Sequence, residues 1–271
     1  MSDTVITFQN VSKEFKLSRL AIRSLQEIFV NLFKPASRGR RRFWALKDVS
    51  FSVKGGETLA ILGMNGSGKS TILKLISRII DPTRGVITIS GRMSALLELG
   101  AGFHPDLTGR ENIYLNGSIL GFSRKAMRQR LDSIIEFADI GEFIDVPIRN
   151  YSSGMQMRLG FSVAVHVEPE IILVDEVLAV GDYSFQLKCL DRIQRMQRDG
   201  VTILFVSHDF EAVERLCSRA VWLENGMLQD EGDVPEILRK MKERYHWDGN
   251  QLASPQPNDR VPELSGGAMS V

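Results

Sequence analysis

The chain has 271 residues, of which 43% are hydrophobic and 25% charged, and its formal net charge is +1. This length and hydrophobic content suit one large or two modest domains with a real core, while the balanced charge gives no overall attraction to nucleic acid, so no nucleic-acid partner is expected. Two cysteines, Cys189 and Cys217, are too few for a disulfide framework, so we expect reduced thiols in a cytosolic protein. The longest uncharged apolar stretch, Leu159–Val167, is far short of the roughly 18 residues of a membrane span, so we expect a soluble chain.

A segment near the N-terminus, Lys16–Phe43, carries a stripe of mostly apolar side chains that recur at helical spacing. The positions of this stripe are Leu17, Leu20, Ala21, Ser24, Leu25, Ile28, Phe29, Leu32 and Phe33. They predict an amphipathic helix, and the basic stretch that follows, Lys34–Arg42, contains no acidic residue. Such a segment suits the anionic face of a membrane; the alternative is a helix packed on its own domain beside a solvated loop.

A glycine-rich pattern follows further along the chain. Gly63–Ser70 fits the phosphate-binding loop pattern G-x-x-x-x-G-K-[ST], between an apolar strand, Thr58–Leu62, and a helical pattern, Thr71–Arg78. Its glycines let successive N–H groups point at phosphate oxygens at the positive end of the following helix. Lys69 is expected to reach the β and γ phosphates, and Ser70 to bind Mg²⁺. A plain glycine-rich turn is the alternative, but the flanking elements favour a site for a nucleoside triphosphate.

Segments rich in Val and Ile alternate with longer helical patterns, which predicts an α/β fold with helices on both faces of a sheet. Besides the strand before the phosphate loop, Ile171–Val174 runs into Asp175 and Glu176, and Thr202–Val206 runs into His208. Ligands bind beyond the carboxyl ends of parallel strands, so these three ends are expected to meet at one nucleotide. An acidic pair alone would more often mark a strand that reaches solvent.

The side chains at these strand ends predict ATP hydrolysis. Asp175 is expected to hold Mg²⁺ through water, Glu176 to orient or deprotonate the attacking water, and His208 to contact the γ-phosphate. The other histidines, which we interpret as surface or packing residues, are His104, His166 and His246. The sequence contains no Cys and His cluster with metal-ligand spacing. Catalysis would then rest mostly on positioning and electrostatic stabilisation.

A second anion-binding pattern precedes the acidic strand. The segment Tyr151–Met155, called the signature segment below, is a small polar turn that opens the helical pattern Gln156–Val167. The first N–H groups of a helix are unsatisfied, and its dipole favours negative charge. With both motifs present, the chain over residues 4–245 resembles the ATP-binding cassette (ABC) ATPases, in which such a segment completes the site of the opposite subunit in a head-to-tail dimer.

This resemblance implies an α/β P-loop NTPase (RecA-like) core with an antiparallel β subdomain, an α-helical signature subdomain and an N-terminal inserted helix. We expect one nucleotide-binding domain at 1–248, with the insertion at 16–43, the helical subdomain at about 100–167, a last helix at Pro235–Tyr245 and a disordered tail at 249–271.

The resemblance also implies a role for each matching residue. The nucleotide-binding positions are Gly63, Asn65, Gly66, Ser67, Gly68, Lys69, Ser70 and Thr71. The positions that contact the opposite subunit's nucleotide are Ser152, Ser153, Gly154 and Met155. The catalytic positions are Lys69, Glu98, Glu176 and His208, and the magnesium ligands are Ser70, Glu98 and Asp175. Asp182 is expected to link the two active sites across the dimer, and the implied cofactors are ATP and Mg²⁺.

Two departures from the family pattern stand out. The signature segment has Ser153 where Gly is usual and Met155 where Gln is usual. The loop before the helical subdomain places Glu98 where the family has Gln, with a one-residue uncertainty in the alignment. A carboxylate there can still bind Mg²⁺ or water, but its contact would depend on pH and metal as an amide's would not.

These departures are similar to those of the ATPase subunits of bacterial polysaccharide exporters, the Wzt-type O-antigen, capsule and teichoic acid transporters. That resemblance implies an ATPase homodimer on the cytoplasmic face of the inner membrane, bound to a homodimer of an integral membrane permease that moves a lipid-linked polysaccharide. The helical subdomain would contact the permease, and the basic stretch Lys34–Arg42 would suit the membrane or the diphosphate of the polymer.

Several alternatives stay open at this point. Phe15 is the first choice for stacking on adenine, and Trp44 is the second. The chain can instead be an importer ATPase with an unusual insertion, a soluble ABC ATPase that works on ribosomes or DNA, or a module that binds ATP without hydrolysing it. The intact Lys69, Asp175 and Glu176 argue against the last alternative.

Overall fold

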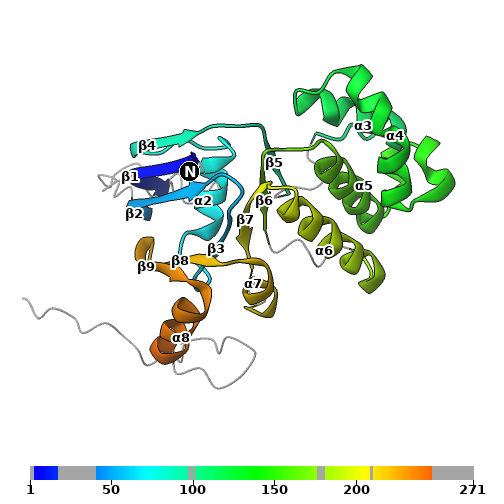
Figure 1. Cartoon of the computed structure of the whole chain (residues 1–271). Helices are drawn as coiled ribbons and strands as arrows, with labels where there is room; N and C mark the ends of the chain where they lie inside the picture. Colours follow the sequence, from blue (N-terminus) through cyan, green and yellow to red (C-terminus); the bar gives the residue numbers. More distant parts are fainter. Residues whose placement is uncertain are drawn as a thin grey trace, which may run out of the picture.

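The computed structural model describes residues 3–17, 41–96, 100, 102–175, 181–207 and 210–245. Its N-terminal part is a three-stranded antiparallel sheet of order β2-β1-β4, seen at one end of the molecule in Figure 1. The strands are β1 (Thr4–Leu17), β2 (Arg41–Lys54) and β4 (Arg84–Ile89). Phe8 and Phe51 stack across β1 and β2 with ring centroids 4.5 Å apart, which fixes one face of this sheet in the core.

The second sheet has six strands in the order β5-β6-β7-β3-β8-β9. Neighbours are parallel except for the antiparallel pair β8 and β9. The strands are β3 (Thr58–Leu62), β5 (Met93–Ala95), β6 (Ile171–Val174), β7 (Thr202–Val206), β8 (Arg219–Glu224) and β9 (Met227–Asp233). The carboxyl ends of β6, β7 and β3 therefore lie side by side at one edge, as the sequence predicts.

Both faces of this sheet are buried at β3, β6, β7 and β8, because alternate side chains of these strands enter different cores. Leu59 and Ile61 of β3 pack with the antiparallel sheet and α2 (Lys69–Ile76). Ala60 and Leu62 pack on the other face with three further helices. These helices are α6 (Tyr183–Arg198), α7 (Phe210–Leu216) and α8 (Val234–Tyr245). Among the residues that the structure describes, none of the helices has both the length and the apolar character that a membrane span requires.

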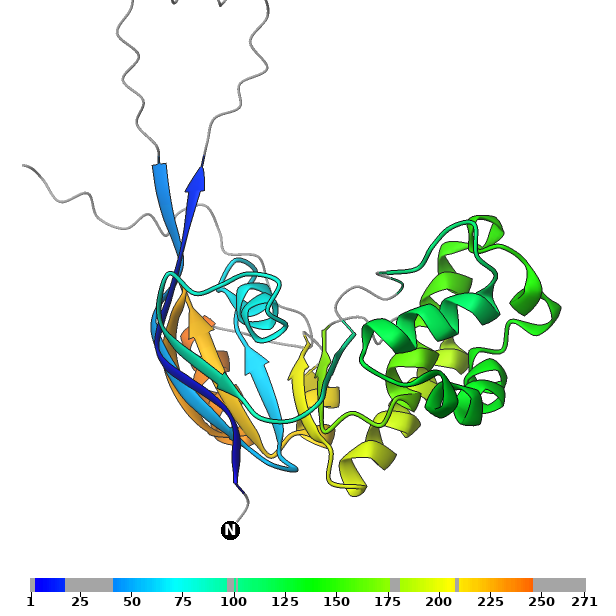
Figure 2. The ribbon, with the colours of Figure 1, turned by 90° about the horizontal axis from the view of Figure 1, so that it is seen from above.

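The helices between β5 and β6 build a core of their own. They are α3 (Gly109–Ile119), α4 (Arg124–Ala138), the short 3₁₀ segments η2 (Gly141–Asp145) and η3 (Ile148–Asn150), and α5 (Ser153–His166). Figure 2 shows them on the far side of the parallel sheet from the antiparallel sheet. The helix α5 joins the two parts, because Leu159 and Val163 enter the core of the helices while Phe161 and Val165 pack with the sheet.

The predicted insertion differs from the structure at its two ends. The strand β1 continues to Leu17 and β2 begins at Arg41, and the pair Lys16↔Arg42 is in register. Continued backbone pairing satisfies N–H and C=O groups that a helix beginning at Lys16 would have to satisfy within itself. Residues 18–40, which hold most of the predicted helix and basic stretch, and the predicted tail at 249–271 lie outside the described residues.

A mostly buried ion pair, Arg219 with Glu57, joins the turn before β3 to both sheets. Arg219 of β8 donates from Nε to Glu57 Oε1 (2.6 Å) and from Nη2 to the carbonyl oxygen of Ser52 in β2 (2.5 Å). The other Glu57 oxygen accepts the backbone N–H of Lys54 at 2.9 Å. Burial raises the pKa of the Glu57 carboxyl, but the hydrogen bonds from Arg219 and Lys54 and the Arg219 charge outweigh burial, so the net pKa is lowered.

We predict that Glu57→Gln lowers the free energy of unfolding by about 2 kcal/mol at neutral pH, because the Arg219 guanidinium stays half-buried without its charged partner. Since folding lowers the pKa of Glu57, this stabilisation is present above the pKa of the unfolded chain and is lost as pH falls through the folded-state pKa. Urea unfolding of both proteins should therefore converge as pH falls from about 7 to about 3.

The matched control is Glu231→Gln, whose carboxylate lies 3.6 Å from Arg219 and is 45% exposed. We expect it to cost less than about 0.5 kcal/mol. An equal loss in both variants, or a Glu57→Gln difference that does not change with pH, would contradict the assignment.

Candidate functional site

The loop between β3 and α2 has a backbone conformation that favours glycine and leaves no room for a side chain at Gly63. Gly63 has a φ of 148° and Gly66 a φ of 80°, both in the region that favours glycine. A Cβ on Gly63 would lie 2.3 Å from the carbonyl oxygen of Leu223 and 2.5 Å from Ser67 Oγ, so this position tolerates no side chain. Around Gly66, by contrast, no atom lies within 4 Å of an added Cβ, so the tip of the loop opens to a ligand.

Lys69 is buried at the start of α2, and its ammonium lies inside the loop. Its Nζ donates to the carbonyl oxygens of Gly63 (2.7 Å) and Met64 (3.2 Å). Ser67 Oγ is also buried and has no hydrogen-bond partner among the described residues. The loop thus presents one buried cation and one buried hydroxyl, which fits an anion with several oxygen acceptors. Ser70, one residue further, is exposed at the same end of α2.

A turn far along the chain forms a backbone hydrogen bond with the phosphate loop. Gly226, between β8 and β9, donates its N–H to the carbonyl oxygen of Ser67 (3.0 Å) and accepts the N–H of Lys47 (2.8 Å). The sequence analysis missed this contact. The Asn225-Gly226 pair is a turn signal, but no sequence pattern indicates which loop that turn will touch.

The sheet order places the acidic strand end near the loop. Asp175 follows β6 and is partly buried, and Ser207 follows β7, which lies between β6 and β3. Three predicted residues, Glu98, Glu176 and His208, lie outside the described residues. No cluster of three or more His, Cys, Asp or Glu with metal-binding geometry occurs within the described part of the chain.

The signature segment opens α5 with an exposed polar end. Ser152 is its N-cap, and its Oγ accepts the N–H of Met155 at 3.2 Å. Beside Gly154 an added Cβ would meet only Ser152 Oγ, at 3.8 Å, so this backbone is open to an approaching group. Both views of the chain show α5 well apart from α2. One chain therefore does not bring the signature segment to its own phosphate loop.

Asp182 is held by α5, a contact that the sequence analysis missed. It is the N-cap of α6, where Oδ1 accepts the N–H of Phe185 at 2.9 Å, and its Oδ2 accepts from Nη2 of Arg158 at 2.6 Å. Arg158 is only 18% exposed, lies 5.0 Å from the centroid of the Phe185 ring and donates to the carbonyl oxygen of Asp139 at 3.3 Å. Two turns of helix after Ser152, it ties the signature helix to the start of α6.

The strand register places the two candidate aromatics for adenine on opposite faces of the strand pair. Lys13 pairs with Leu46 and Glu14 with Trp44, so β2 has a one-residue bulge between them. Phe15 then shares a face with Lys13 and Leu46, whereas Trp44 lies on the opposite face. The ring contacts agree: Lys13 Nζ lies 5.3 Å from the Phe15 centroid, and Arg84 lies 5.4 Å from that of Trp44.

The Leu46 face is the one that meets the phosphate loop. A Cβ on Gly68 would lie 2.6 Å from Leu46 Cδ2. The described geometry therefore favours Phe15 over Trp44 as the aromatic on the nucleotide side.

Comparisons with known proteins agree with this architecture. The ABC transporter family model matches residues 46–179. The chain is 49% identical over 245 residues to the O-antigen export system ATP-binding protein RfbB of Klebsiella pneumoniae, covering 89% of this chain and 98% of that protein. It is 42% identical over 254 residues to the teichoic acids export ATP-binding protein TagH of Listeria monocytogenes serotype 4b, covering 94% and 73%.

A solved structure shares the fold. The dimeric post-hydrolysis form of the ATP-binding cassette MJ0796, bound to ADP and phosphate, superposes with a TM-score of 0.67 at 24% identity, covering 84% of this chain and 98% of that one. The predicted P-loop fold with antiparallel and helical parts is thus confirmed. Given near-complete coverage of a relative at 49% identity, the chain belongs to the ATP-hydrolysing, ATP-binding subunits of the ABC transporter family.

Proposed function

We propose that this chain is the ATP-hydrolysing subunit of an exporter that moves a lipid-linked polysaccharide of the O-antigen, capsule or teichoic acid type across the bacterial inner membrane. The observation that carries the proposal is the identity of 49% to an O-antigen export ATP-binding protein over 98% of that protein's length. It acts as a homodimer on the cytoplasmic face, bound to a homodimer of a membrane permease.

The phosphate loop supplies the groups that hold ATP. On binding, the Lys69 ammonium exchanges the neutral carbonyl acceptors of Gly63 and Met64 for phosphate oxygens, which accept stronger hydrogen bonds. The orphaned hydroxyl of Ser67 gains a partner at the same time. Ser70 at the end of the loop pattern and Asp175 after β6 would hold Mg²⁺, and Glu98, which lies outside the described residues, would be a third ligand. The metal neutralises the charge of the phosphate oxygens when bound.

Hydrolysis is assigned to residues that follow neighbouring strands. Glu176 comes directly after Asp175 at the end of β6 and would orient or deprotonate water, and His208 follows β7 and would contact the γ-phosphate. Their positions lie outside the described residues, so these roles rest on sequence order and on the adjacency of β6 and β7.

A second copy of the chain completes the site. The signature segment has an open backbone at Gly154 and an exposed polar helix end at Ser152, both suited to phosphate. Because α5 lies apart from α2 in the same chain, these groups can reach a nucleotide only across a dimer. Arg158 fixes Asp182 against the same helix, so movement of the signature segment on the partner's nucleotide would carry the start of α6 with it.

Two other functions remain for testing: the ATPase of an importer and a soluble ABC ATPase. Purification of the tagged chain from its native membrane in detergent, followed by mass spectrometry of protein and glycolipid, separates them. We expect a permease and a polyprenyl-linked polysaccharide to co-purify. Recovery of a solute-binding protein with its permease would indicate an importer, and recovery of ribosomes or DNA would overturn the transporter assignment.

We predict that Lys69→Ala weakens binding of MgATP at least about tenfold, because hydrogen bonds from a charged donor are lost at the phosphates. The matched control is Lys74→Ala, which removes an exposed lysine from the same helix and should leave affinity within about twofold. Calorimetric titration measures both. Equal losses in the two variants would show that α2 had been disturbed and that Lys69 has no special role.

We also predict an energetic coupling between Arg158 and Asp182. A double-mutant cycle of Arg158→Gln and Asp182→Asn should give about 1 kcal/mol in urea unfolding, because a largely buried guanidinium donates a 2.6 Å hydrogen bond to a carboxylate that is itself 62% exposed. The control cycle uses Asp139→Asn, whose carboxylate is 3.5 Å from Arg158 and 73% exposed, and should give less than about 0.5 kcal/mol. A coupling with Asp182 no larger than this control would mean that Arg158 does not fix the start of α6.

A further inference from the structure

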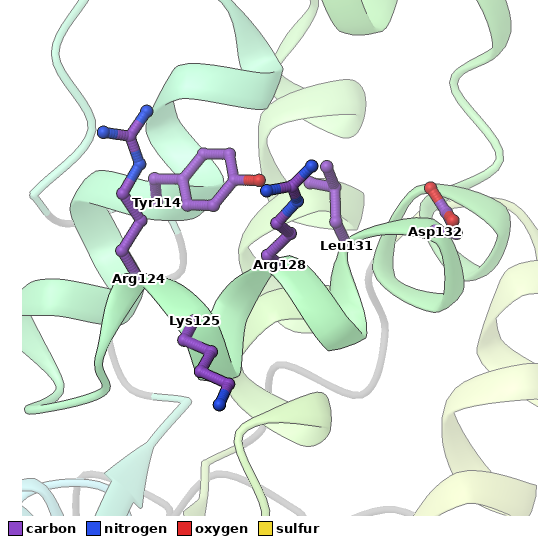
Figure 3. Close-up of a pocket in the computed structure, with 6 residues that line it drawn as sticks. All are labelled: Tyr114, Arg124, Lys125, Arg128, Leu131 and Asp132. Carbon is purple, nitrogen blue, oxygen red and sulfur yellow. The ribbon is translucent and has the colours of Figure 1, made fainter.

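A surface cavity of about 660 Å³, open to solvent and lined mostly by exposed side chains, lies between α3 and α4, away from the phosphate loop and the signature segment. Its volume is in the range of small-molecule sites, roughly 300–1,000 Å³. Figure 3 shows the six side chains that line it. They are Tyr114, Arg124, Lys125, Arg128, Leu131 and Asp132. Three are cations and one is a carboxylate.

The three cations differ from the other arginines of this helical part. Arg110, Arg130, Arg149 and Arg158 each lie within ion-pair distance of a carboxylate, their partners being Asp145, Glu168, Asp106 and Asp182. Among the residues described by the structure, Arg124, Lys125 and Arg128 have no carboxylate within 4.0 Å. Their charge is therefore uncompensated within the part of the chain that is described.

This placement costs stability in the free protein. Arg124 and Arg128 are four residues apart on α4, where like charges repel. Arg124 and Lys125 also lie in the first turn of that helix, whose dipole disfavours cations. Among the described residues that line the cavity, Asp132 carries the one opposing charge, and its side chain is exposed. A bound anion would relieve both unfavourable terms, whereas a neutral or cationic ligand would relieve neither.

The side chains further narrow the class of anion. The Arg124 guanidinium lies over the Tyr114 ring, 5.7 Å from its centroid, and Figure 3 shows Arg124 and Arg128 flanking that tyrosine. Guanidinium groups present N–H donors in a fork that matches phosphate oxygens, and the tyrosine hydroxyl adds a donor. Leu131 and the ring supply an apolar wall for whatever the phosphate is attached to.

We propose that this cavity, lined by Tyr114, Arg124 and Arg128, binds a phosphate group. The group can belong to a membrane lipid or to a soluble phosphate compound, since the recognising chemistry is the same. The proposal does not depend on the transport function, because it uses none of the residues assigned to ATP.

The test measures pyrophosphate binding by calorimetry with every variant made in a Lys69→Ala background, so that the phosphate loop contributes equally. Arg124→Gln combined with Arg128→Gln should weaken binding at least about tenfold. The control pair Arg195→Gln and Arg198→Gln removes the same charge from the last turn of α6 and should leave affinity within about twofold. Asp132→Asn should tighten binding, because it removes the one negative charge from the wall.

Two checks guard against misfolding. The Arg124 and Arg128 double variant should be at least as stable to urea as its parent without ligand, because repulsion is relieved. Arg124→Lys keeps the charge but loses the fork, and should weaken binding by a smaller factor. Equal weakening by the α6 control, or no weakening by the double variant, would overturn the proposal.

Flotation with vesicles identifies the source of the phosphate. If the group is an anionic lipid headgroup, vesicles of phosphatidylglycerol should retain the parent but not the double variant. Vesicles of phosphatidylcholine alone should retain neither protein. Arginine-dependent binding of pyrophosphate without such retention would assign a soluble ligand. Arginine-dependent binding of an acidic peptide, with no effect on either phosphate probe, would replace the phosphate site with a protein contact.

Discussion

The approach of two backbone segments at the end of β3 sets the geometry on which the rest of the site depends. Gly63 lies so near the carbonyl oxygen of Leu223 that no side chain fits, and the neighbouring turn at Gly226 bonds the loop at Ser67. The loop is thus shaped by β8 and β9, which follow it by more than half the chain. The parallel neighbours of β3 and the antiparallel pair β8 and β9 hold this loop in place. The loop in turn holds the ammonium of the buried Lys69.

The same fold separates the phosphate loop from the signature segment. The parallel sheet collects the phosphate loop and the acidic strand end at one edge, while α5 carries the signature segment into a part of the molecule with its own core. The helix α5 packs into both cores, and through Arg158 it also holds the start of α6. The signature segment is thus connected to the sheet by packed side chains of α5 and to the start of α6 by one ion pair.

The elements that could be predicted from the sequence are those that depend on residues close together in the chain. The strand and helix around the phosphate loop, the strand before Asp175 and the polar turn that opens α5 follow from apolar patterns and glycines within a few positions, although α5 begins at Ser153 and not at the predicted Gln156. Contacts between distant segments were missed: Gly226 behind the loop, Arg158 on Asp182, and the pairing of β1 with β2 past Lys16. These depend on which segments meet in three dimensions, and no short pattern encodes that.

The bulge in β2 between Leu46 and Trp44 decides on which face of the strand pair the tryptophan lies. The extra residue is Ala45, which lies between the partners of two consecutive residues of β1. Regular pairing of Ala45 with Glu14 would put Trp44 opposite Phe15 and on the Leu46 face, whereas the bulge keeps Trp44 on the face of Glu14. Loss of Ala45 would leave the register on both sides of it unchanged, so a change of strand length at this one position turns no side chain over.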